Sequence, residues 1–120
     1  MRDKRLSLGA GAVAWVLCGL AMAVPGLARA DDAALVARGK ALFTTVKPAC
    51  AVCHTLQAAG STGQVGPVLD ELKPDGARVL RALHSGLGVM PSYAEQLSEA
   101  DMRALAAFVS QSTGGAPLAR

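Results

Sequence analysis

Apolar residues recur at helical spacing in three stretches of the chain. The first stretch follows Asp31 and Asp32, whose carboxylates suit the start of a helix. Its apolar positions share one face and are Leu35, Gly39, Leu42, Phe43 and Val46. Pro48 is expected to end this helix, because proline lacks a backbone N–H and clashes with the preceding turn.

A second helix is expected after Asp75. Its apolar stripe consists of Val79, Leu80, Leu83 and Leu87. Three polar residues are expected to face away from that stripe, and they are Arg78, Arg81 and Ser85. Gly86 and Gly88 are expected to end the helix, since glycine commonly follows a helix C-terminus.

A third helix is expected to start at Ser98, with Asp101 three residues later in an arrangement that resembles a capping box. Its apolar face consists of Met102, Leu105, Phe108 and Val109. This helix should end before Gly114, and the tail formed by residues 113–120 is expected to fray.

The segments between these helices are loops. Residues 57–67 are rich in glycine, serine and threonine, and residues 88–93 form a second loop. No alternation of apolar and polar residues typical of a strand is seen. The pattern therefore predicts an all-α protein whose functional residues lie in long loops.

Residues 1–30 have the layout of a secretory signal peptide. A basic start is followed by an uncharged stretch from Leu6 to Ala28, and the segment ends in Ala28-Arg29-Ala30. We expect cleavage after Ala30 and export to the periplasm. The alternative is a retained membrane anchor, because the uncharged stretch is long enough to span a bilayer. The break at Pro25 and the ending favour cleavage.

Removal of 30 of the 120 residues leaves a single domain of 90 residues. The leader contains four of the 12 basic and one of the nine acidic residues, so the remainder has eight of each and no formal net charge. Nothing in this charge suggests a nucleic-acid partner. Only Phe43, Tyr93 and Phe108 supply aromatic mass, and domains this small often need a cofactor, metal or disulfide.

Cys50-Ala51-Val52-Cys53-His54 carries the candidate chemistry. C-x-x-C-H is the attachment signature of c-type haem. Two thiols one helical turn apart can each add to a vinyl group on one haem edge, and His54 then supplies a proximal imidazole to the iron. The motif therefore predicts one haem c bound covalently through Cys50 and Cys53.

Three other interpretations of the cysteine pair stay open. An exported chain with two cysteines can form a structural disulfide. A thioredoxin-like redox pair would need strands alternating with helices, which the pattern does not show. A zinc site would need further ligands at suitable spacing, and His84 is the one other histidine.

The second axial ligand of the iron is predicted to be Met90. It lies in a loop between Gly88 and Pro91, where glycine permits a close approach to a flat haem and proline stiffens the chain. Met102 lies on the apolar stripe of the last helix and is expected in the core. His84 is a minor candidate ligand, at the edge of the second helix.

These features together resemble the class I cytochrome c family over residues 33–111. The resemblance rests on the Cys50–His54 motif, on Gly66-Pro67, on Met90-Pro91, and on Gly39, Phe43 and Phe108 in the outer helices. It implies helices packed around one haem in a cytochrome domain spanning residues 31–112. It also implies that the carbonyl of Pro67 accepts a hydrogen bond from His54, and that the first and last helices cross near Gly39.

Two loop sequences are similar to those of monohaem cytochromes that accept electrons from bacterial sulfite dehydrogenases. They are residues 63–75 and residues 86–91. The expected function is therefore electron transfer between redox proteins that dock transiently at the haem edge. With both axial positions filled the chain should not be an enzyme, and after cleavage it should have no membrane span. The alternatives are an open-site haem protein for gas sensing or peroxidase-like catalysis, and a disulfide module without haem.

Overall fold

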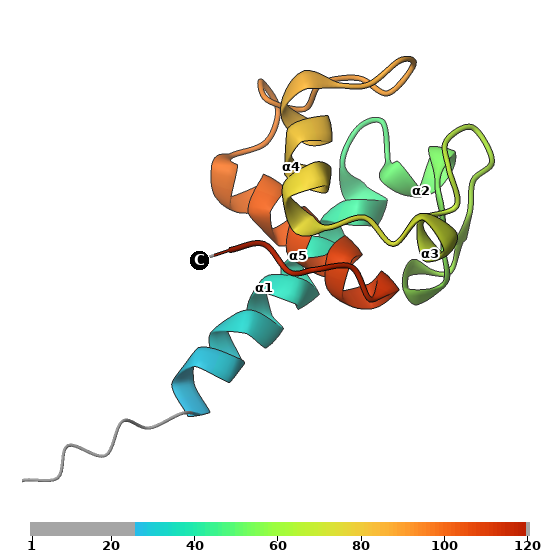
Figure 1. The fold of residues 1–120 in the computed structure, drawn as a ribbon. Helices are drawn as coiled ribbons and strands as arrows, with labels where there is room; N and C mark the ends of the chain where they lie inside the picture. The colour runs from blue at the N-terminus through green and yellow to red at the C-terminus, as the bar shows by residue number, and fades with distance from the viewer. Residues whose placement is uncertain (1–25, 120) are drawn as a thin grey trace, which may run out of the picture.

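The computed structural model describes residues 26–119, so the expected leader lies outside it except for residues 26–30. The secondary structure, shown in Figure 1, consists of α1 (Gly26–Thr45), α2 (Cys50–Cys53), β1 (Thr55–Leu56), the 3-10 turn η1 (Gln57–Ala59), β2 (Ser61–Thr62), α3 (Leu69–Leu72), α4 (Gly76–Ser85) and α5 (Glu99–Thr113). The expected all-α class is confirmed, since the described strands are two residues long each. Within residues 26–119 no helix has both the length and the apolar character needed to cross a membrane.

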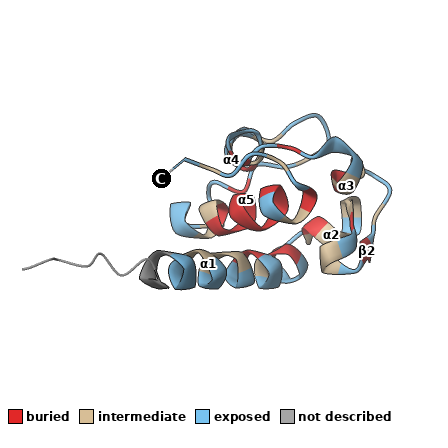
Figure 2. Cartoon of the chain, turned by 60° about the horizontal axis from the view of Figure 1, so that its bottom comes forward, coloured by how far each residue is buried: buried red, intermediate tan, exposed pale blue. Residues whose placement is uncertain are grey.

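The core forms where α1 crosses α5, and these two helices share the largest interface of the described residues. At the crossing, a side chain on Gly39 would overlap the Ala104 carbonyl and would lie 2.7 Å from Phe108 Cβ. The rings of Phe43 and Phe108 pack edge to face, with 5.8 Å between their centroids. Figure 2 shows α5, most of whose residues are buried, lying alongside α1. The expected crossing near Gly39 is thus present.

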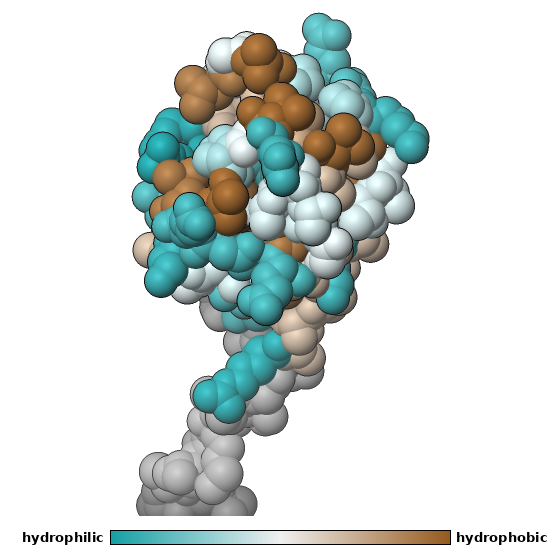
Figure 3. All heavy atoms as spheres, turned by 90° about the vertical axis from the view of Figure 1, so that its right-hand side faces the viewer, coloured by the Kyte–Doolittle hydropathy of each residue, from teal (hydrophilic) through white to brown (hydrophobic). Residues whose placement is uncertain are grey.

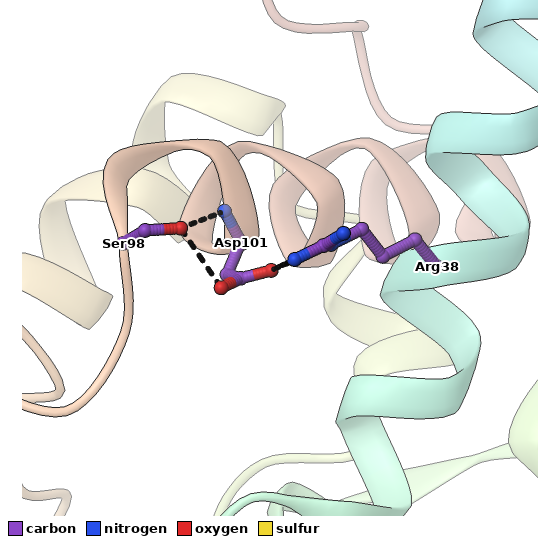
Figure 4. Close-up of polar contacts among 3 residues, drawn as sticks. All are labelled: Arg38, Ser98 and Asp101. Atoms are coloured by element: carbon purple, nitrogen blue, oxygen red, sulfur yellow. Dashed lines mark hydrogen bonds and ion pairs between the residues drawn. The ribbon is translucent and has the colours of Figure 1, made fainter.

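The expected start of α5 is confirmed in detail. Ser98 Oγ accepts a hydrogen bond from the Asp101 backbone N–H at 3.1 Å and donates to the Asp101 carboxylate at 2.8 Å. Arg38 on α1 donates to the same carboxylate through Nε at 2.6 Å (Figure 4). The three side chains therefore join the start of α5 to the middle of α1.

Replacement of Asp101 by asparagine tests this connection through its pH dependence. The hydrogen bond from Ser98 and the guanidinium of Arg38 lower the pKa of Asp101 below its ordinary value of 3.8. A lowered folded-state pKa contributes stability above pH 3.8, which is lost as the pH falls through the folded pKa. We expect the free energy of unfolding of the native chain to exceed that of the variant at pH 7 by at most about 1 kcal/mol, because the Arg38 side chain is 61% exposed and solvent screens the pair.

Urea unfolding of both proteins between pH 7 and pH 2 measures this difference. The advantage of the native chain should shrink as the solution becomes more acid than about pH 4. An advantage that stays constant down to pH 2 would contradict a role for the ionised carboxylate.

One expected helix boundary and one expected stripe position are wrong, while the expected end of the second helix at Gly86 is confirmed. α1 begins at Gly26 rather than after Asp31, because the intervening leucine, alanine and arginine residues favour helix as strongly as the residues that follow. Ala30 and Asp31, the residues on either side of the expected cleavage point, therefore lie within α1. α4 ends at Ser85, and Leu87 lies beyond it with 72% of its surface exposed, so Leu87 is not part of the apolar stripe.

The C-terminal tail is docked where fraying was expected. Gly114 has a φ of +79°, which turns the chain back after α5. The Ala116 carbonyl then accepts a hydrogen bond from Gly76 N–H at 2.9 Å, and the Ala119 carbonyl accepts one from Arg103 at 3.0 Å. The described part of the tail thus bridges the start of α4 and the side of α5.

Candidate haem-binding site

A cavity of about 600 Å³ lies between α2, α4, α5 and the loops that precede α3 and follow α4. This is a common size for a pocket that holds a small molecule or cofactor. All five residues expected at the site line it, although they come from distant parts of the chain. They are Cys50, Cys53, His54, Pro67 and Met90.

The cysteines lie on α2, a single helical turn that the sequence pattern did not predict as a separate helix. Cys50 is buried, Cys53 is half-buried, and both are free thiols. Burial raises the pKa of the Cys50 thiol to about 11, and the neighbouring Cys53 contributes in the same direction. A thioredoxin-like cysteine has a lowered pKa instead, so this environment does not suit that alternative.

His54 follows directly and leaves the helix with an extended backbone, while its N–H donates to the Cys50 carbonyl at 2.9 Å. Its Nδ1 lies 2.9 Å from the Pro67 carbonyl oxygen. Because a carbonyl only accepts, Nδ1 carries a proton, and in the neutral form of the ring Nε2 keeps its lone pair. The hydrogen bond therefore prepares the imidazole for metal coordination through Nε2.

The loop that supplies Pro67 closes tightly around His54. Thr55 donates to the Gly63 carbonyl at 2.9 Å, and Gly66 N–H donates to the Cys53 carbonyl at 2.8 Å. A Cβ on Gly66 would lie 2.5 Å from Cε1 of His54, so glycine is required for the backbone to lie against the ring. The loop thus fixes the plane of the imidazole.

Replacement of Gly66 by alanine is expected to lower the free energy of unfolding by about 1–3 kcal/mol, as overpacking does elsewhere. The new methyl group would displace either the His54 ring or the loop and would strain the bond to Pro67. Urea unfolding of the purified protein measures the effect. Gln64→Ala is the matched control, because Gln64 is exposed in the same loop. Equal urea midpoints for Gly66→Ala and Gln64→Ala would contradict the tight packing of Gly66 against the His54 ring.

Met90 is presented by a short turn. Leu87 and Met90 exchange both backbone hydrogen bonds at 3.0 Å, and Gly88 has a φ of +59°, as at the first central position of a II′ turn. The far side of the turn is anchored by Ser92, which donates to the His84 carbonyl at 2.6 Å. The Met90 side chain therefore sits on a braced segment of the cavity wall.

Tyr93 provides a second anchor for this segment, which the sequence pattern had counted only as aromatic mass. Its backbone N–H donates to the Leu83 carbonyl, and its hydroxyl donates to the Pro48 carbonyl at 2.8 Å. Burial raises the pKa of Tyr93 to about 12, so the phenol stays protonated as a donor. The cavity wall is therefore tied to the segment just before α2.

The other candidate ligands lie elsewhere. Met102 is 3% exposed in the core and does not line the cavity, in agreement with its expected core position. His84 is also absent from the cavity wall, and its Nε2 lies 2.9 Å from a Glu99 carboxylate oxygen.

One face of α4 differs from the expectation. Arg78, Arg81 and Ser85 were expected to point away from the apolar stripe, yet all three line the cavity together with Val79 and Leu83. The exposed side chains of both arginines place them at the rim. Helical spacing predicts that polar residues face solvent. It could not show that these three residues lie at the edge of a cavity, because a cavity edge can also accept polar side chains.

Comparison with known proteins agrees with this geometry. A family model described as "Cytochrome C oxidase, cbb3-type, subunit III" matches residues 34–109, which is more than half of the chain. Among solved structures, the chain is similar to the c-type cytochrome SorU from Sinorhizobium meliloti, with a TM-score of 0.66. The sequences are 42% identical, and the match covers 72% of this chain and 99% of that chain. The chain therefore belongs to this family of c-type cytochromes, whose fold is built around covalently bound haem c.

Proposed function

We propose that the chain is a monohaem electron carrier, with thioether bonds from Cys50 and Cys53 and axial bonds from His54 and Met90. The observation that carries this proposal is the convergence of these four side chains on one cavity. When bound, the haem supplies a single-electron ferric–ferrous couple. This chain's residues hold that group, fix its orientation and exclude water from it.

Contacts within the chain hold His54 and Met90, the two proposed iron ligands, in place. Pro67 holds the His54 ring in one tautomer, and the turn from Leu87 to Met90 holds the thioether in place. If His54 and Met90 both hold the iron, no position on it would be left for a substrate. Electron transfer without catalysis is the function that this arrangement supports best.

Part of the cavity rim is apolar and offers a docking surface for redox partners. Four large apolar side chains that line the cavity are also exposed, namely Val65, Leu72, Leu87 and Val89. Figure 3 shows brown apolar surface among polar patches on the side that carries α2 and α3. An apolar patch on a domain with no formal net charge favours brief encounters with little electrostatic steering.

Location and processing form part of the same proposal. A signal peptide over residues 1–30, followed by a cytochrome domain over residues 31–112, would deliver the protein to the periplasm. Support comes from the basic, apolar and Ala-x-Ala layout of the leader. N-terminal sequencing of the protein recovered from the periplasm tests this, and a chain starting at Met1 would contradict it.

The proposed electron donor is a sulfite dehydrogenase-like enzyme. Support comes from the resemblance of residues 63–75 and 86–91 to loops of cytochromes that serve such enzymes. Both segments contribute to the cavity wall, through residues such as Val65 and Val89. Partner recognition requires that the residues specific to one electron donor lie on the surface where that donor docks, and these two segments meet that requirement.

Mixing the oxidised holoprotein with a purified sulfite dehydrogenase and sulfite tests this donor in a stopped-flow spectrometer. We expect rapid reduction that depends on both enzyme and sulfite, and little change of rate with added salt. Val89→Asp should slow the reaction several-fold, while Ala37→Asp, on the exposed side of α1, should not. Reduction by dithionite but not by the enzyme would exclude this donor and leave the carrier function in place.

A further inference from the structure

We propose that Arg78 and Arg81 bind the two propionate carboxylates of the haem and thereby raise its reduction potential. This inference rests on the proposed function, because it requires the haem to lie in the cavity. It adds a role for two residues of α4 that neither attach the haem nor coordinate its iron.

The permanently charged residues that line the cavity are all positive. Six lining residues are titratable or charged, and they are Cys50, Cys53, His54, Arg78, Arg81 and Tyr93. None of the described lining residues is acidic. The thiols are consumed by thioether formation, and the Tyr93 hydroxyl already donates to Pro48. The arginines are therefore the fixed charges of this wall, and both are positive.

The two guanidinium groups are positioned as a pair. Residues three apart on a helix are neighbours on its surface, so Arg78 and Arg81 project from adjacent turns of α4. Among residues 26–119 neither side chain forms a hydrogen bond or an ion pair. The nearest carboxylate in sequence, Asp75, accepts a hydrogen bond from the Arg78 backbone N–H at 2.6 Å and caps the helix.

Two like charges on neighbouring turns repel each other, which disfavours the helix by a few tenths of a kcal/mol. A ligand with two carboxylates removes that repulsion and matches the pair in number. Arginine also binds carboxylates through two parallel hydrogen bonds, which lysine cannot do. The haem is such a ligand, since it carries two propionates.

The position of α4 fits the geometry of the porphyrin. The vinyl groups that react with cysteines and the propionates are on opposite halves of the ring. Attachment at α2 would therefore direct the propionates away from α2, and Figure 1 shows α4 lying across from α2. Residues 31–120 contain no tryptophan whose indole N–H could donate a hydrogen bond to a propionate.

The effect on the iron follows from Coulomb's law. A positive charge near the haem stabilises the ferrous state, which carries one more electron. A unit charge acting over roughly 10 Å at an effective dielectric constant of about 20 changes the redox equilibrium about tenfold. For a one-electron couple, a tenfold change corresponds to about 59 mV.

The test is spectroelectrochemical titration of the holoprotein carrying Arg78→Gln and Arg81→Gln together. We expect the midpoint potential to fall by at least about 59 mV, which corresponds to a tenfold change in the redox equilibrium constant. Lys40→Gln is the control, because it removes one positive charge from an exposed position of α1 away from the cavity. The single arginine variants are measured in the same way, in case the double variant does not accumulate.

Arg78→Lys and Arg81→Lys together separate charge from shape. These substitutions keep both charges and should recover part of the lost potential. A double glutamine variant with a c-type spectrum and the potential of the control would overturn the proposal, and so would a lysine variant as low as the glutamine variant. A native protein without attached haem would instead overturn the proposed function itself.

Discussion

Replacement of Cys53 by alanine is expected to remove most of the stably attached haem. The two thiols of α2 lie one turn apart on the cavity wall, and each would form one thioether bond. A single thioether at Cys50 leaves the haem free to pivot, so that His54 no longer meets the iron in a fixed geometry. Haem-specific staining of the protein on a denaturing gel measures covalent attachment directly.

Val52→Ala is the matched control for this experiment. Val52 lies between the two cysteines on the same turn, and its side chain is 64% exposed. The control should keep full covalent attachment, because neither thiol nor His54 changes. Undiminished haem staining in Cys53→Ala would show that Cys53 is not an attachment point.

Replacement of Met90 by alanine is expected to keep the haem attached but to open one axial position. The thioether of Met90 is replaced by a methyl group that cannot reach the iron. Since axial ligands set haem potentials over about 0.8 V, we expect the reduction potential to fall on the order of 100 mV. The reduced variant should also bind carbon monoxide, which a spectral shift reports.

Met102→Leu is the control, since it replaces the one other methionine among residues 31–120. Met102 is buried in α5 away from the cavity, and leucine has a similar volume. Its spectrum and potential should match those of the native protein. A Met90→Ala protein with an unchanged potential and no response to carbon monoxide would contradict Met90 ligation.

The helices α4 and α5 could be predicted because each combines an apolar stripe with a capping residue. Asp75 and Ser98 cap α4 and α5 as expected, and the stripe of α5 is buried. The start of α1 could not be located, because alanine-rich sequence favours helix on both sides of Asp31. The single turns α2 and α3 and the pairing of β1 with β2 are too short to show any periodicity.

At the site, the motif residues could be named in advance because their chemistry depends on local spacing. Their convergence depends on tertiary structure, through contacts such as that of Gly66 with His54. The arginines of α4 could not be recognised, since an exposed charge on a helix usually faces only solvent. The docking of the tail depends on the positive φ of Gly114, which a glycine in the sequence permits but does not require.

The central claim is that the chain carries a haem c whose iron is closed by His54 and Met90. The most direct measurement is the visible spectrum of the protein matured in cells with haem-attachment machinery, recorded oxidised, reduced, and reduced with carbon monoxide. We predict a sharp low-spin c-type spectrum that carbon monoxide leaves unchanged. A spectrum that shifts with carbon monoxide would contradict the closed site, and a colourless protein would contradict the haem itself.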